Sequence, residues 1–217
     1  MILKGIYLYP DLTNYRDEVV HPFRDQSRSI CNFLERSIKP VRFFSEGFKR
    51  ICFVAQSEPR EDCFINSSKV LIVEIPFDEI EYLKKEKKDL NKYFSKLIKA
   101  GIIKASKEYK IPEIELKNAL RNFEMNEYKN NWLFKKKFQK TMGIEYSISC
   151  ELTIDRFYSR LIINKSNKII FNKVIIETEP DEIIFSPMLK DVKFFDGYFY
   201  VLNKMDEVIF KISYNDI

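Results

Sequence analysis

Short apolar runs near the start of the chain predict β-strands. They occupy residues 2–9, 48–55 and 69–75, and the first of them ends at Pro10. The run at 69–75 is almost wholly apolar, which is typical of a central strand that is covered on both faces. The first part of the chain is therefore expected to contribute strands to a sheet.

Apolar residues at helical spacing predict a helix between the first two strands. The helix is expected to run from a cap at Asp25 or Ser27 to about Ile38 and to end before Pro40. The preceding segment, residues 10–24, is interpreted as a loop.

The middle of the chain predicts further helices. From a cap at Asp89, apolar residues recur at i, i+3, i+4 and i+7 as far as Tyr109, and Pro112 suits the first turn of another helix. The segment 132–138 fits either a strand or a continuation of that helix.

From Gly143 onward, the spacing changes to that of an antiparallel meander. Asp196-Gly197 stands between two aromatic runs and predicts a type I′ hairpin turn. The strands are expected at residues 145–153, 156–164, 168–178, 182–185, 191–195, 198–203 and 207–213.

These elements predict an α+β fold with N-terminal strands, a central helical segment and an antiparallel β-meander in the C-terminal third. We expect a single domain over residues 1–217. Within it, a mixed α/β lobe over 1–142 and a meander lobe over 143–217 are possible divisions.

The amino-acid composition argues against most of the common catalytic motifs. The chain has one histidine and five glycines in 217 residues. Loops that cradle phosphate need glycine for close backbone approach, and neither G-x-G-x-x-G nor G-x-x-x-x-G-K-[ST] is present. We therefore expect a protein that is not an enzyme and that has no cofactor.

The sequence also lacks the motifs that are typical of targeting signals and of metal sites. The first residues lack the basic and apolar regions of a signal peptide, and no apolar run approaches the about 20 residues of a membrane span. The cysteines lack the paired spacing of zinc ligands and are expected to be inert thiols. A cytoplasmic protein without a membrane partner or a metal site follows as the expectation. The cysteines are Cys31, Cys52, Cys63 and Cys150.

Charge is segregated along the chain. Residues 84–110 hold ten lysines against three acids, and residues 129–140 hold five lysines and no acid. Since the whole chain has a net charge of only +5, the remaining segments are acidic. The net charge alone therefore says little about the partner.

The densest acidic run has three interpretations. It comprises Glu177, Glu179, Asp181 and Glu182 around Pro180. The three are a solvated turn, a set of ligands for a hard cation such as Mg²⁺, and a patch that docks a basic partner. The third interpretation is our hypothesis for a partner-binding site, and Asp78, Glu79 and Glu81 extend the patch if folding brings them close.

Three other groups of residues suggest alternatives. The single histidine, His21, stands close to Arg24 and Asp25, so a general base is conceivable, but no motif places a nucleophile beside it. Lysines interleaved with aromatic residues in the basic centre are typical of a nucleic-acid surface, although a solvated helix face has the same composition. Tyrosines of the strand patterns are interpreted as half-buried sheet residues or as a ligand surface; they are Tyr7, Tyr9, Tyr198 and Tyr200.

In general character, with no catalytic motif, segregated charge and an acidic turn at 177–182 in a strand-rich half, the chain resembles the immunity proteins of bacterial toxin systems, including contact-dependent inhibition. This resemblance implies a non-catalytic protein that binds a cognate toxin domain and blocks its active site. Many such toxins are nucleases with basic clefts, which an acidic surface would suit. The alternative is a nucleic-acid-associated protein that uses its lysine-rich centre.

Overall fold

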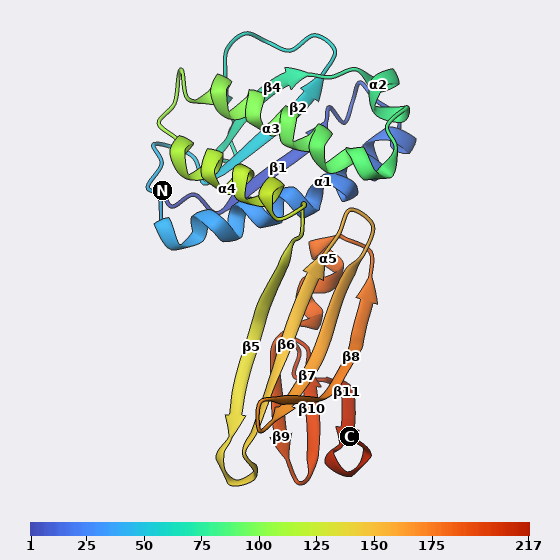
Figure 1. Cartoon of the computed structure of the whole chain (residues 1–217). Coiled ribbons are helices and arrows are strands. Elements are labelled where there is room, and N and C mark those ends of the chain that lie inside the picture. Colours follow the sequence, from blue (N-terminus) through green and yellow to red (C-terminus); the bar gives the residue numbers. More distant parts are fainter. The chain divides into compact units, whose positions relative to one another are not determined.

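The computed structural model describes all 217 residues and divides into two compact units, residues 1–130 and 131–217 (Figure 1). The boundary lies before the strand that begins at Asn131. That strand, which the sequence analysis placed in an N-terminal lobe, therefore belongs with the meander. The chain has an α+β fold, and each unit has its own core.

The N-terminal unit is built on a sheet with the strand order β1-β2-β4-β3. β1, β2 and β4 are parallel, and the short β3 is antiparallel to β4. β4 lies inside the sheet, as the apolar run at 69–75 predicts. The elements are β1 (Gly5–Pro10), α1 (Asp17–Ile38), β2 (Arg50–Gln56), β3 (Phe64–Ile65), β4 (Val70–Pro76), α2 (Glu79–Leu83), α3 (Leu90–Ala105) and α4 (Glu113–Met125).

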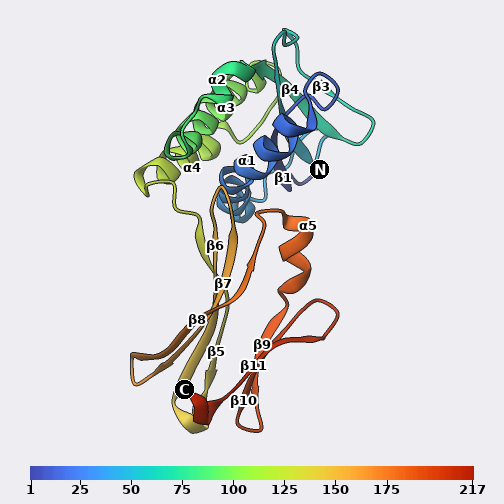
Figure 2. The ribbon, with the colours of Figure 1, turned by 90° about the vertical axis from the view of Figure 1, so that its right-hand side faces the viewer.

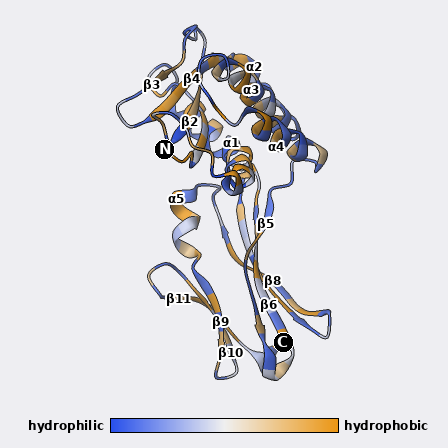
Figure 3. Cartoon of the chain, turned by 90° about the vertical axis from the view of Figure 1, so that its left-hand side faces the viewer, coloured by the Kyte–Doolittle hydropathy of each residue, from blue (hydrophilic) through white to orange (hydrophobic).

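The core of this unit lies between the sheet and helices on one of its faces. α1 packs on β1, α3 packs on β4, and α4 packs on both helices, all on the same side of the sheet (Figures 2 and 3). Alternate strand residues point toward these helices because side chains of a strand alternate between its faces. The strand side chains of this core are Ile6, Leu8, Ile51, Phe53, Ala55, Leu71, Val73 and Ile75.

The helix α1 begins at Asp17, so the prediction of a loop over residues 10–24 was wrong for its second half. Val19, Val20 and Phe23 are buried on the helix face that packs on the core, and this burial extends the helix toward its N-terminus. Pro22 lies just beyond the first turn and removes only one backbone hydrogen bond there.

The predicted antiparallel meander is confirmed in the C-terminal unit, where it forms two sheets with a shared core. Their strand orders are β5-β6-β7-β8 and β11-β10-β9. Tyr146 of the larger sheet and Phe199 of the smaller one meet with ring centroids 5.3 Å apart. The elements are β5 (Asn131–Gln139), β6 (Ile144–Leu152), β7 (Phe157–Lys165), β8 (Lys168–Thr178), α5 (Glu182–Phe185), β9 (Asp191–Phe195), β10 (Tyr198–Leu202) and β11 (Val208–Ser213).

Two local predictions in this unit had opposite outcomes. The hairpin turn at Asp196-Gly197 is confirmed, since both residues have positive φ, 49° and 75°. The strand predicted at 182–185 is instead the helical turn α5. Asp181 caps this turn by accepting a hydrogen bond from the backbone N–H of Ile183 at 2.9 Å, and Phe185 stacks on Phe157 at a centroid distance of 4.0 Å.

Two further observations concern cysteines and helices. The four cysteines are buried and form no disulfide, and burial raises the pKa of the Cys52 thiol to about 12, so this thiol stays protonated at neutral pH. None of the helices combines the length and apolarity that a membrane span requires.

Candidate functional site

The acidic residues singled out in the sequence belong to both units. Asp78, Glu79 and Glu81 lie at the start of α2 in the N-terminal unit. The others, Glu177, Glu179, Asp181 and Glu182, lie between the end of β8 and α5 in the C-terminal unit. Each unit therefore contributes one acidic cluster, and each is described by itself.

The cluster on α2 has local structural roles. The side chain of Asp78 caps the helix by accepting a hydrogen bond from the backbone N–H of Glu81 at 3.0 Å. The carboxylate of Glu81 pairs with Lys85 one turn later at 2.8 Å. Glu79 is partly buried and has no such partner. Only part of this cluster is thus available to a partner.

The cluster after β8 is more exposed. Glu177 and Glu179 are exposed, and neither carboxylate has a side-chain partner. Asp181 caps α5, and both Asp181 and Glu182 are partly buried. Two free carboxylates therefore stand beside the capping carboxylate of Asp181 and the partly buried Glu182.

The strand register enlarges this cluster. Glu151, Tyr158 and Glu177 are paired across β6, β7 and β8, so the two carboxylates flank one tyrosine on the same face of the sheet. Asp155 lies exposed in the turn between β6 and β7. We call the resulting surface the acidic end; it comprises Glu151, Asp155, Glu177, Glu179, Asp181 and Glu182.

An exposed apolar side chain projects beside the acidic end. Ile183 is 82% exposed and Ile184 is 43% exposed, because a helix of only four residues can bury just one of its apolar side chains, Phe185. Large exposed apolar residues next to polar ones are typical of protein-binding surfaces. The sequence pattern missed Ile183 because the run 182–185 was interpreted as a strand, although Asp181 has the capping signature that indicates a helix.

The structure does not bring the acids together as metal ligands. Nowhere do three or more histidine, cysteine, aspartate or glutamate side chains converge in a group that could hold a metal ion. The carboxylates of residues 177–182 are therefore separate charges on a surface.

The histidine considered as a general base lies on an exposed helix face. His21 is in α1, and its imidazole is 3.8 Å from the carboxylate of Asp17, one turn earlier. Asp25, the residue expected to orient it, pairs with Arg24 at 3.0 Å. The three residues thus do not form the arrangement that the sequence suggested.

The lysine run of β5 is largely neutralised within the C-terminal unit. Lys137 pairs with Asp191 of β9 at 2.8 Å, and Lys135 approaches the same carboxylate at 3.8 Å. Lys136 pairs with Glu145 of β6 at 2.7 Å. Lysines on edge strands also discourage pairing with another chain. These contacts account for the run without a nucleic-acid ligand.

The lysines of α3 are less engaged. Lys92, Lys96 and Lys99 follow one another along the helix, have no side-chain partner and line one cavity of about 450 Å³. This stripe is one part of the basic centre that remains available for a polyanion, and Glu81, Asp89 and Glu124 line the same cavity.

The four strand tyrosines are half-buried, as expected of sheet residues. Tyr198 and Tyr200 already share a cation–π partner, because the ammonium of Lys211 lies 4.0 Å and 5.3 Å from their ring centroids. Burial, followed by the neighbouring Cys52, raises the pKa of Tyr9 far above its ordinary value. These tyrosines are therefore explained by packing within their own sheets.

Comparisons with known proteins give no relative for this chain: no family model, no curated protein and no solved structure matches it.

Proposed function

We propose that this chain is a non-catalytic binding protein that neutralises a cognate bacterial toxin domain, in the manner of immunity proteins. In this proposal it acts in the cytoplasm, and the acidic end of the C-terminal unit docks on a basic surface of the toxin. The observation that carries the proposal is the exposed Ile183 beside the free carboxylates of Glu177 and Glu179.

The charge of the acidic end favours a basic partner. The segments that carry its six carboxylates, residues 151–160 and 177–182, contain two basic residues, Arg156 and Arg160. A surface of one sign steers a partner of opposite sign during diffusion and raises the association rate. A nuclease domain, whose cleft is basic because it binds phosphates, is the partner class that this charge suits best.

The apolar side chain adds the component that charge alone does not supply. Rim charges mainly set the association rate, whereas buried apolar anchors at the centre of an interface slow dissociation. Ile183 projects from a capped turn whose Phe185 is fixed in the core, so its position is defined before binding. The acidic end thus combines an anchor with steering charges.

The experiment is capture of partners from the native cells with tagged full-length protein and its variants. We expect a basic protein domain to be retained at stoichiometric amounts and to be lost with Ile183→Ser. The matched control is Ile169→Ser, because Ile169 is also an exposed isoleucine of this unit, 63% exposed, at the other end of β8. Equal retention by both variants would remove the acidic end from the proposal.

A second candidate function is association with nucleic acid through the lysine stripe of α3. The supporting observation is that Lys92, Lys96 and Lys99 share one cavity and lack side-chain partners. Lysine provides phosphate contacts but little base recognition, so any such binding would be independent of sequence and strongly dependent on salt.

A further inference from the structure

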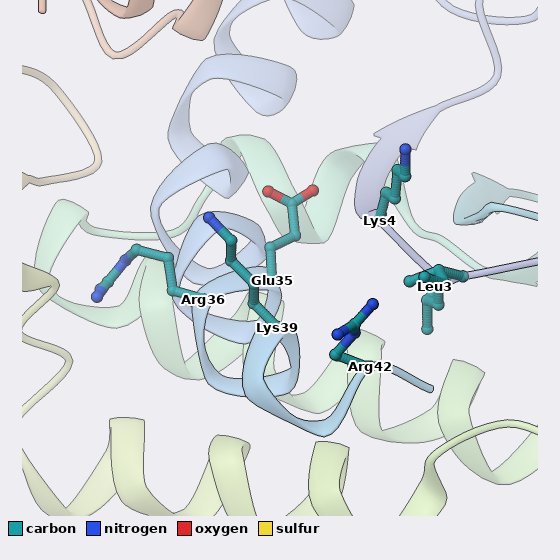
Figure 4. A pocket seen from close by; sticks show the side chains of 7 residues that line it. Leu3, Lys4, Glu35, Arg36, Lys39 and Arg42 are labelled. Carbon is teal, nitrogen blue, oxygen red and sulfur yellow. The ribbon is translucent and has the colours of Figure 1, made fainter. Parts of the chain in front are cut away.

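The N-terminal unit contains a cavity of about 570 Å³ at the C-terminal end of α1. The segment before β1 forms one wall, and the last turns of α1 with the 3₁₀ turn Lys39–Val41 form the other (Figure 4). The volume is within the range of about 300–1,000 Å³ that is usual for small-molecule sites. The lining residues are Ile2, Leu3, Lys4, Glu35, Arg36, Lys39 and Arg42.

Four of these seven lining residues are cationic, and Glu35 is the only acid. The C-terminal end of a helix has a partial charge equivalent to about −0.5, which favours one nearby cation. The helix end therefore explains only part of the positive charge that gathers here.

The carboxylate of Glu35 does not neutralise the lysines of the cavity. Its Oε1 accepts a hydrogen bond from the backbone N–H of Ile6 at 2.7 Å, and its Oε2 pairs with the guanidinium of Arg28. Both partners belong to the packing of α1 against the edge of the sheet. The positive charge of Arg28 therefore neutralises the negative charge of Glu35, so Glu35 does not neutralise the lysines of the cavity.

Arg36 is also engaged elsewhere. Its Nε donates to Asn32 at 3.2 Å, its Nη2 donates to Asn130, and Figure 4 shows its side chain directed away from Lys4 and Arg42. Three cations remain, Lys4, Lys39 and Arg42, and their charged groups have no hydrogen-bond or ion-pair partner in the structure.

We propose that this cavity binds a small organic phosphate that carries at least two negative charges. Three unpaired cations around one hollow repel one another, and a multiply charged anion relieves that repulsion. Arginine suits phosphate because its guanidinium donates two parallel hydrogen bonds, and lysine supplies a mobile charge. Ile2 and Leu3 give the cavity an apolar wall for the organic part of the ligand.

The test is calorimetric titration of the full-length protein with adenosine diphosphate and, separately, with inorganic pyrophosphate. We expect saturable binding of adenosine diphosphate, tighter than that of pyrophosphate because of the apolar wall. Lys39→Gln and Arg42→Gln are each expected to weaken it about tenfold, since each removes one charge-assisted contact. Circular dichroism verifies that both variants remain folded.

The matched control is Lys107→Gln, because Lys107 is an exposed lysine of the same unit that has no side-chain partner and does not line this cavity. Unchanged binding by this variant supports the assignment. Three results would overturn it: no saturable binding of either probe, equal losses for Lys107→Gln and Lys39→Gln, or binding of an RNA oligonucleotide alone. Absence of saturable binding would mean that the cations only balance the partial negative charge at the C-terminal end of α1. Binding of RNA alone would mean that the cations contact the backbone of a polymer.

Discussion

The ammonium of Lys137 in β5 lies 2.8 Å from the carboxylate of Asp191 in β9, and this ion pair joins the two sheets of the C-terminal unit. Burial alone would raise the pKa of Asp191. The hydrogen bond and charge of Lys137, the backbone N–H of Val192 and the charge of Lys135 outweigh it and lower the pKa below its ordinary value. The lysine run of β5 resembles a nucleic-acid surface, but Lys135 and Lys137 of this run have a structural role because they bind Asp191 of the other sheet.

Replacing the acceptor of this ion pair should destabilise the C-terminal unit. Asp191→Asn is expected to lower the free energy of unfolding by about 1 kcal/mol at neutral pH, because a partly buried charged hydrogen bond is lost. The fluorescence of Trp132 measures this, since Trp132 is the only tryptophan and packs against the core of this unit. Asp206→Asn, which removes the exposed pair with Lys190, should have no measurable effect.

The same pair predicts a pH dependence. Since folding lowers the pKa of Asp191, its contribution is present above the pKa of the unfolded chain, about 4. It is lost as the pH falls through the lower pKa of the folded state. The stability difference between the wild type and Asp191→Asn should therefore shrink on acidification, and a difference that grows instead would show that another group is responsible.

The edge of the N-terminal sheet gives a second stability prediction. Glu35 and Arg28 hold the outer backbone groups of Ile6, since Glu35 accepts from its N–H and Arg28 donates to its carbonyl at 3.0 Å. Both side chains are at least 86% buried, so Glu35→Ala leaves an unpaired charge and should cost about 3 kcal/mol. Urea unfolding followed by circular dichroism measures the loss, and hydrogen exchange of the Ile6 amide should accelerate. Glu115→Ala, at an exposed position of α4, is the control.

Packing of α3 on the sheet gives a third prediction. A Cβ atom added to Gly101 would overlap the ring of Phe53 in β2. Gly101→Ala is therefore expected to destabilise the protein by about 1–3 kcal/mol, although helix propensity alone predicts a gain of about 1 kcal/mol. Thermal unfolding distinguishes the two signs. Gly143→Ala meets no neighbouring atom and should cost only the strain of its positive φ.

Much of the fold could be predicted because its pattern is local. The apolar runs that became β2 and β4 and the turn at Asp196-Gly197 depend on spacing within a few residues. The start of α1 and the helical turn α5 were not found in this way, and at α5 the capping signature of Asp181 is the one local signal. In both cases the decisive contact is with a distant residue, such as the stacking of Phe185 on Phe157.

The candidate site was predicted only in part for the same reason. The acids from Glu177 to Glu182 are consecutive in the chain, so composition revealed them. Glu151 joins them through the register of three strands, which composition does not contain. The capping roles of Asp78 and Asp181 belong to short helical turns that the sequence analysis did not predict.

The nucleic-acid alternative makes a separable prediction about two sets of lysines. If the chain binds single-stranded nucleic acid, replacing Lys92, Lys96 and Lys99 by glutamine should abolish the binding, because these lysines have no internal partner. Replacing the run at 135–137 should instead alter the unfolding of the C-terminal unit. Filter binding at several salt concentrations measures the affinity for nucleic acid. Binding that is absent, or that does not weaken as the salt concentration rises, would contradict this function.

The affinity of the purified partner domain for two charge variants tests whether the acidic end binds a basic partner. Glu177→Lys/Glu179→Lys leaves the cap at Asp181 intact and should weaken binding at least about tenfold, mainly through slower association at low salt. Asp216→Lys, which reverses an exposed charge elsewhere in the same unit, should leave the affinity unchanged. Equal affinity of the double variant and the wild type would contradict the account.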